Sequence, residues 1–152
     1  MKDDPSPYYS VGLAKDDNLF EWSITLFGPA GTLYEGGMFQ ATMKFPSNYP
    51  FAPPELKFDS HVWHPNVYTN GLVCISILHQ PSADPSGYED VRDRWNPAQT
   101  VDSILVSVLS MLSDPNDESP ANVDAAIQWR TDRKKFELEA RRCAEKTLMF
   151  ED

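Results

Sequence analysis

The segment HPNVYTNGLVCISIL, residues 64–78, contains the residue types best suited to covalent chemistry in this chain. Its cysteine, Cys74, follows the triplet His64, Pro65 and Asn66 after seven intervening residues. A cysteine thiol can act as a nucleophile, bind a metal or pack in a core. The residue types around Cys74 indicate what each of these alternatives would need.

A metal centre is the first alternative. Possible zinc ligands occur close together in the sequence: His61, His64, Cys74 and His79. Structural zinc takes four nitrogen or sulfur ligands in a tetrahedron. The spacing of these residues is irregular and there is no second cysteine pair, so we expect no bound metal.

A cysteine with a histidine base, as in a hydrolase, is the second alternative. It needs a histidine held by a third group, and the sequence does not show which side chains meet in space. The third alternative is a thiol that receives an already activated acyl group and passes it on. Such a thiol needs no strong base. The tetrahedral oxyanion needs a hydrogen-bond donor, and the Asn66 amide is suited to that role.

Size and composition favour one domain with a hydrophobic core. The chain has 152 residues, of which 41% are apolar and 24% charged. Its net charge of −10 argues against nucleic-acid binding, which needs a basic surface. No apolar run is long enough for a transmembrane helix, and the start MKDDPSPYYS does not resemble a secretory signal. Two cysteines are too few for a disulfide framework, so we expect a cytoplasmic or nuclear protein.

The elements that position Cys74 are predicted to be strands. Runs with β-like patterns are joined by short turns and predict an antiparallel meander: Tyr8–Ala14, Leu19–Phe27, Met38–Phe45 and Glu55–Asp59. The proline-rich segment 46–54 predicts an ordered extended loop, because proline lacks an amide donor and fixes φ.

Helices are predicted after the cysteine. Thr100 can cap a helix from Val101 to about Leu112, and Asn122 can cap a second one through Trp129. A third helix would begin after a Thr131 cap and carry Cys143 on its apolar face, so we expect that cysteine to pack in the core. Strands followed by helices predict an α+β fold in a single domain, residues 1–152.

Together these motifs resemble the ubiquitin-conjugating enzyme family. His-Pro-Asn, seven residues and then cysteine is similar to that family's active site. Further segments resemble the family in the correct order: TLYEGGMF, FPSNYPFAPPELKF, WNPAQTVDSILVSVLSML and DPNDESPANVDAA with WRTDR. The resemblance extends from about Tyr8 to about Lys146. It implies the UBC-like fold, a four-stranded antiparallel meander followed by about three helices.

The resemblance also implies a reaction. Cys74 would accept the C-terminal carboxyl of ubiquitin as a thioester, and Asn66 would stabilise the oxyanion during transfer to a lysine. His64 and Pro65 would support that geometry. The partners would be ubiquitin, an activating enzyme that consumes the ATP, and a RING-type ligase, with no bound cofactor and no nucleic acid. The ligase would dock on two loops that carry Phe51, Pro97 and Ala98.

Acidic residues form a further part of the resemblance. The insertion at residues 79–91 resembles the acidic loop of the ER-degradation subgroup, which would place the protein, through an adaptor, at the cytosolic face of the ER.

An ordinary thiol has a pKa of about 8.5 and suits a preactivated donor, whereas an attacking lysine must lose a proton. Carboxylates that could assist are Asp84, Glu89, Asp90, Asp93, Asp117 and Glu118. Ser119 stands where many family members carry an acid.

One feature supports a different function. The family begins with an amphipathic helix, whereas this chain starts almost at its first predicted strand, where Pro5 and Pro7 disfavour a helix. We therefore expect that helix to be absent. The alternative to an active enzyme is a non-catalytic or truncated module that binds ubiquitin or a ligase.

Overall fold

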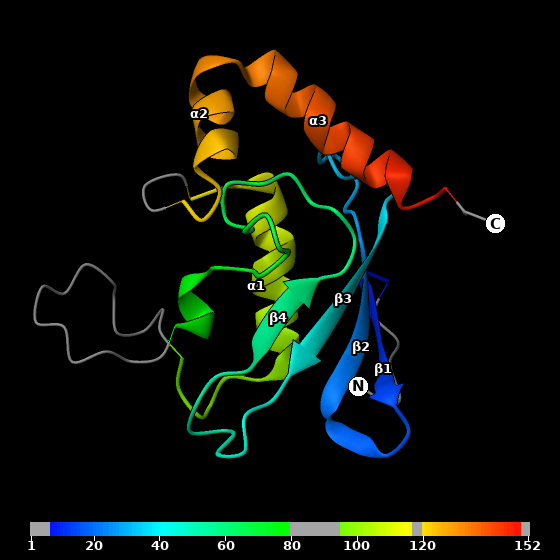
Figure 1. Cartoon of the computed structure of the whole chain (residues 1–152), viewed down its shortest axis with the longest axis vertical. Helices are drawn as coiled ribbons and strands as arrows, with labels where there is room; N and C mark the ends of the chain where they lie inside the picture. The colour runs from blue at the N-terminus through cyan, green and yellow to red at the C-terminus, as the bar shows by residue number, and fades with distance from the viewer. Residues whose placement is uncertain (1–6, 80–94, 117–119, 150–152) are drawn as a thin grey trace, which may run out of the picture.

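The computed structural model of the chain describes residues 7–79, 95–116 and 120–149 (Figure 1). In chain order the strands are β1 (Tyr9–Lys15), β2 (Asn18–Phe27), β3 (Met38–Lys44) and β4 (Glu55–Phe58). A short 3-10 helix, η1 (Ser76–Leu78), follows, and then come α1 (Val101–Ser113), α2 (Val123–Thr131) and α3 (Arg133–Lys146). The predicted order of strands before helices is confirmed.

The four strands form one antiparallel sheet in the order β1-β2-β3-β4, which is the predicted meander. In the register, Ile24 of β2 lies opposite Val11 of β1 and Ala41 of β3. Ile24, Leu26 and Ala41 are buried, while Thr25 and Gln40 on the other face hydrogen-bond to each other. The period of two along β2 and β3 thus places one apolar face toward the core.

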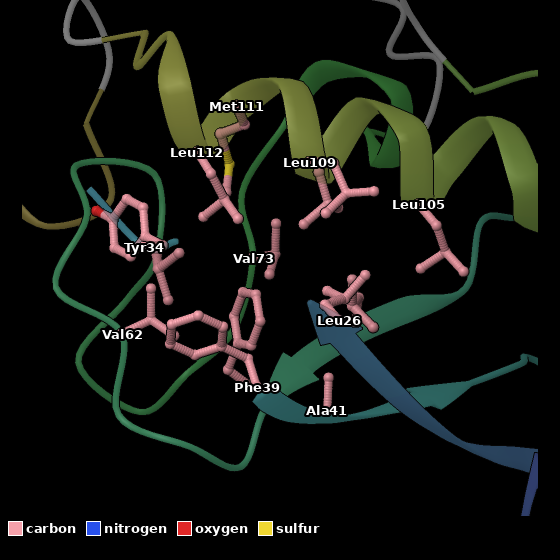
Figure 2. Close-up of a cluster of buried hydrophobic side chains, with 14 of the residues drawn as sticks. Leu26, Tyr34, Phe39, Ala41, Val62, Val73, Leu105, Leu109, Met111 and Leu112 are labelled. Atoms are coloured by element: carbon pink, nitrogen blue, oxygen red, sulfur yellow. The ribbon is translucent and has the colours of Figure 1, made fainter. Parts of the chain in front are cut away.

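Helix α1 packs its apolar face on the sheet. Figure 2 shows Leu105, Leu109 and Leu112 pointing from α1 toward the sheet residues Leu26, Phe39 and Ala41. The predicted cap is confirmed: Thr100 Oγ1 accepts from the Ser103 amide, and Ser103 Oγ accepts from the Thr100 amide. This capping box satisfies two amides at the helix start. The Tyr9 hydroxyl donates to Asp102 and ties β1 to the first turn of α1.

Helices α2 and α3 lie together at one end of the sheet (Figure 1). Asn122 caps α2 as predicted, since its side chain accepts from the Ala125 amide. The predicted cap of α3 is wrong. Thr131 is the last residue of α2 and its hydroxyl donates back to the Ile127 carbonyl, whereas the Asp132 side chain accepts from the Lys135 amide at 3.3 Å.

Cys143 lies in the core, as predicted. It is 1% exposed on the inner face of α3, and its Sγ accepts a hydrogen bond from the Trp63 amide at 3.2 Å. Burial raises the pKa of this thiol, so it stays protonated and unreactive near neutral pH.

The proline-rich segment 46–54 is not extended as predicted. It folds into consecutive turns, in which the Tyr49 amide donates to the Pro46 carbonyl and the Phe51 amide donates to the Asn48 carbonyl. Proline fixes φ in a range that also suits the second position of a β-turn, so its presence did not decide between the two conformations. None of the helices in the described ranges is long and apolar enough to span a membrane.

Candidate active site

Cys74 lies at the end of a short antiparallel pairing next to the His-Pro-Asn triplet. Val67 and Val73 form an isolated β-bridge, and the Cys74 amide then donates to the Asn66 carbonyl at 2.8 Å. The cysteine side chain is partly exposed, in contrast to the buried Cys143. An accessible thiol held by a rigid backbone is the geometry that a nucleophile needs.

His79 contacts the Cys74 thiol. Its Nε2 lies 3.5 Å from Sγ, because η1 turns the chain back after the cysteine. The sequence indicates His79 as a possible zinc ligand and as the start of the insertion at residues 79–91, and it does not predict this contact. The five-residue spacing gives no signal of its own, since it brings two side chains together only if a tight turn separates them.

His64 is fully buried and uses both of its ring nitrogens. Its Nε2 donates to the Met111 carbonyl in α1 at 2.7 Å, and its Nδ1 accepts from the Asn66 amide at 2.9 Å. This pairing requires the neutral ring with the proton on Nε2. Burial lowers the pKa of His64 to about 4, although the bond to Met111 partly opposes the shift. The ring therefore anchors the turn and is not available as a base at neutral pH.

The Asn66 side chain forms a pair of hydrogen bonds with the backbone of one residue beyond α1. Its Nδ2 donates to the Asn116 carbonyl at 2.7 Å, and its Oδ1 accepts from the Asn116 amide at 2.9 Å. The residue is 3% exposed. An amide nitrogen carries two N–H groups, and the bond to Asn116 uses one of them. Asn66 thus holds the Asn116 backbone beside the His-Pro-Asn triplet.

Pro65 completes the set of links from the triplet. Its carbonyl accepts from the Ala121 amide at 2.8 Å and from the Asn122 amide at 2.9 Å, just before α2. The three consecutive residues therefore tie together the end of α1, Asn116 after α1, the start of α2 and the backbone of Cys74. Their buried polar groups make this framework costly to deform.

The four possible zinc ligands do not form a metal centre. Both nitrogens of His64 are engaged with the backbone, so the ring cannot coordinate a metal. Across the described ranges, no group of three or more histidine, cysteine, aspartate and glutamate side chains is arranged to hold a metal ion. This part of the chain instead brings the His79 imidazole next to the Cys74 thiol.

Comparison with known proteins decides the family. The family model described as "Ubiquitin-conjugating enzyme" matches residues 1–144. The chain belongs to the ubiquitin-conjugating enzyme family. It is similar to ubiquitin-conjugating enzyme E2 7 of Arabidopsis thaliana, with 57% identity over 143 residues that cover 94% of this chain and 86% of the relative.

Two further relatives extend the comparison. Ubiquitin-conjugating enzyme E2 15 of Schizosaccharomyces pombe is 50% identical over 148 residues, which cover 97% of this chain and 89% of the relative. Ubiquitin-conjugating enzyme E2 G2 of Homo sapiens is 49% identical over 138 residues, which cover 91% of this chain and 84% of the relative.

These similarities give the activity. This ubiquitin-conjugating enzyme carries ubiquitin as a thioester and transfers it, with an activating enzyme and a ligase as partners. The described strands and helices have the order that the UBC-like fold predicts. Neither the fold nor the relatives favour the alternative of a non-catalytic binding module.

The predicted docking residues of the enzyme lie on two exposed loops. Phe51 is 73% exposed, and Pro97 and Ala98 are also exposed. Trp95 lies buried beside both loops, and its Nε1 donates to the Pro50 carbonyl at 2.9 Å. A large apolar side chain held this far out of the core is suited to contact with another protein.

The predicted acidic residues lie outside the described residues. They are the carboxylates in and just after the insertion, those after α1, and the serine next to the latter: Asp84, Glu89, Asp90, Asp93, Asp117, Glu118 and Ser119. Of the predicted insertion, residues 79–91, only His79 is described. The Trp95 amide donates to the His79 carbonyl at 3.1 Å.

Proposed function

We propose that Cys74 is the thioester-forming nucleophile of this enzyme. The supporting observation is the position of its thiol, which is partly exposed, fixed through its amide to Asn66 and in contact with the His79 imidazole at 3.5 Å. The other cysteine, Cys143, is 1% exposed and has a raised pKa, so it is a poor candidate for the same reaction.

The reaction follows from thiol chemistry. The Cys74 sulfur attacks the thioester carbonyl of ubiquitin on the activating enzyme, a new carbon–sulfur bond forms, and the activating enzyme's thiolate leaves. A lysine amine then attacks the same carbonyl carbon, and the Cys74 thiolate leaves as the amide bond forms. Activation before the first step consumes ATP on the activating enzyme, so this chain needs no bound cofactor.

His79 and Asn66 would serve the second step. A side chain that touches Sγ also lies near the carbonyl carbon once that carbon is bonded to Sγ. The His79 imidazole is therefore placed to accept the proton that the lysine amine loses. Asn66 would donate the N–H that Asn116 does not use to the oxyanion, while its bonds to Asn116 hold the loop.

We further propose that the enzyme belongs to the ER-degradation subgroup. The acidic insertion at residues 79–91 supports this assignment. Carboxylates of the insertion would assist the incoming lysine, and a RING-type ligase would dock on Phe51, Pro97 and Ala98. An adaptor would recruit the enzyme to the cytosolic face of the ER.

A charging assay tests the nucleophile. The full chain is incubated with ubiquitin, activating enzyme and ATP, and the products are separated on a non-reducing gel with and without added thiol. Wild type and Cys143→Ser should give an adduct that thiol removes, and Cys74→Ser should give a thiol-resistant oxyester. Cys74→Ala should give none, and a thiol-sensitive adduct on Cys74→Ala would contradict the proposal.

A further inference from the structure

Trp95 connects segment 46–54 to His79 through its two N–H groups. Its side chain is 1% exposed, and its indole Nε1 donates to the Pro50 carbonyl at 2.9 Å. Its backbone amide donates to the His79 carbonyl at 3.1 Å. It also lies two residues before Pro97, so it joins both exposed loops to the histidine beside the thiol.

The His79 backbone is held on both sides. Its amide donates to the Ser76 carbonyl at 2.9 Å at the end of η1, and its carbonyl accepts from the Trp95 amide. With the backbone fixed at both points, few side-chain torsions remain to place the ring, whose Nε2 lies 3.5 Å from Cys74 Sγ. A shift of the Trp95 backbone would therefore move the imidazole relative to the sulfur.

The indole ring fixes that backbone in turn. Its Nε1 bond to Pro50 and its packing against Tyr49, with ring centroids 5.9 Å apart, attach it to the turns of segment 46–54. The two N–H groups of Trp95 thus donate to segment 46–54 and to His79. A buried indole N–H usually finds a hydrogen-bond partner, and that of Trp95 finds it on segment 46–54.

We propose that Trp95 is a positioning residue for ubiquitin transfer, which holds the His79 imidazole against Cys74 and attaches that contact to the loop of Phe51. The inference rests on the proposed role of Cys74. Trp95 itself touches no reacting atom and acts through His79. Misplacement of an assisting group slows the step that it serves, so the effect belongs to transfer to lysine rather than to charging.

The test compares two tryptophans that make the same kind of hydrogen bond. Trp95→Phe keeps an aromatic ring and removes the indole donor to Pro50. Trp22→Phe is the matched control, because Trp22 Nε1 donates to the Leu19 carbonyl at 2.9 Å on the sheet. Each variant is charged, the activating enzyme is stopped, and the discharge of the thioester to free lysine is followed over time. Trp95→Tyr, which fills more of the indole site, is the second variant should Trp95→Phe not fold.

We expect Trp95→Phe to charge normally and to discharge about two- to tenfold more slowly, the range that one net hydrogen bond allows. Trp22→Phe should discharge at the wild-type rate. In a His79→Gln background, Trp95→Phe should change the rate by less than about twofold, because the group that it positions is already gone. A merely structural tryptophan would instead give additive effects.

Two results would overturn the inference, and they are distinguishable. If Trp95→Phe charges normally and discharges like Trp22→Phe, or if its effect persists in full with His79→Gln, Trp95 does not position His79 and the role of Cys74 is untouched. If Cys74→Ala forms the thiol-sensitive adduct, the proposed nucleophile is wrong and the inference about Trp95 falls with it.

Discussion

The buried His64 should make the enzyme lose stability as the pH falls from about 6.5 to about 4. Its ring is fully buried, and burial lowers the pKa of the folded state from 6.5 to about 4. Between these values the unfolded chain binds a proton that the folded chain does not, so the free energy of unfolding decreases as the pH decreases. The stability that the neutral His64 ring contributes is intact above about pH 6.5, and it is lost once the pH has fallen to the folded-state pKa of about 4.

The magnitude follows from the size of the shift. Each pKa unit corresponds to about 1.4 kcal/mol, so the shift from 6.5 to about 4 corresponds to about 3 kcal/mol. This is a large share of a typical stability of about 5–15 kcal/mol. Protonation would also remove the Nδ1 acceptor of the Asn66 amide and so disturb the backbone that carries Cys74.

Urea unfolding at a series of pH values measures this effect, with His64→Gln as the variant that cannot titrate at this site. The variant should be less stable at about pH 7, because two buried backbone groups lose a partner. The difference from wild type should then shrink by about 2–3 kcal/mol on going to about pH 4.5. His61→Gln, which changes an exposed histidine, is the control. A difference that stays constant with pH would refute the reasoning.

Three other predictions use the same framework. Asn66→Ala should slow discharge to lysine by about 10²–10³ and lower the stability by about 1–3 kcal/mol, since the Asn116 backbone loses its two hydrogen bonds to Asn66; normal discharge with lowered stability in urea would make Asn66 purely structural. Phe51→Ala should change stability by less than about 0.5 kcal/mol, because the ring is 73% exposed, yet reduce ligase-stimulated discharge measured against ligase-free discharge. Thr100→Ala should lower the thermal midpoint through a loss of about 1 kcal/mol at the α1 cap, with charging unchanged.

The secondary structure was largely readable from the chain. The four strands and the three α-helices lie within one or two residues of their predicted positions, because their periods of 2 and 3.6 match the buried faces, whereas the 3-10 helix η1 was not predicted. Thr100 and Asn122 were recognisable caps. The cap of α3 was not, since Thr131 and Asp132 are both good cap residues and only the course of α2 decides which of them is free to accept the amide.

By itself, the sequence determined the family, the order of the elements and the identity of the candidate nucleophile. These three conclusions rest on residue types at fixed spacings along the chain, so they require no knowledge of which residues meet in space. Cys143 was recognisable as a core residue for the same reason, because it lies on the apolar face of a helix.

Only the tertiary structure decided how the candidate site is held together. His64 meets Met111 across 47 residues, and Asn66 meets Asn116 across 50. No local pattern encodes these pairs, because they form only when α1 packs on the sheet and brings its end to the triplet. The contact of His79 with Cys74 is short in sequence, yet it too depends on the fold, since Trp95 holds the His79 carbonyl from beyond the insertion. A hydrogen bond needs its donor and acceptor within about 3 Å, and that precision comes from packing rather than from spacing along the chain.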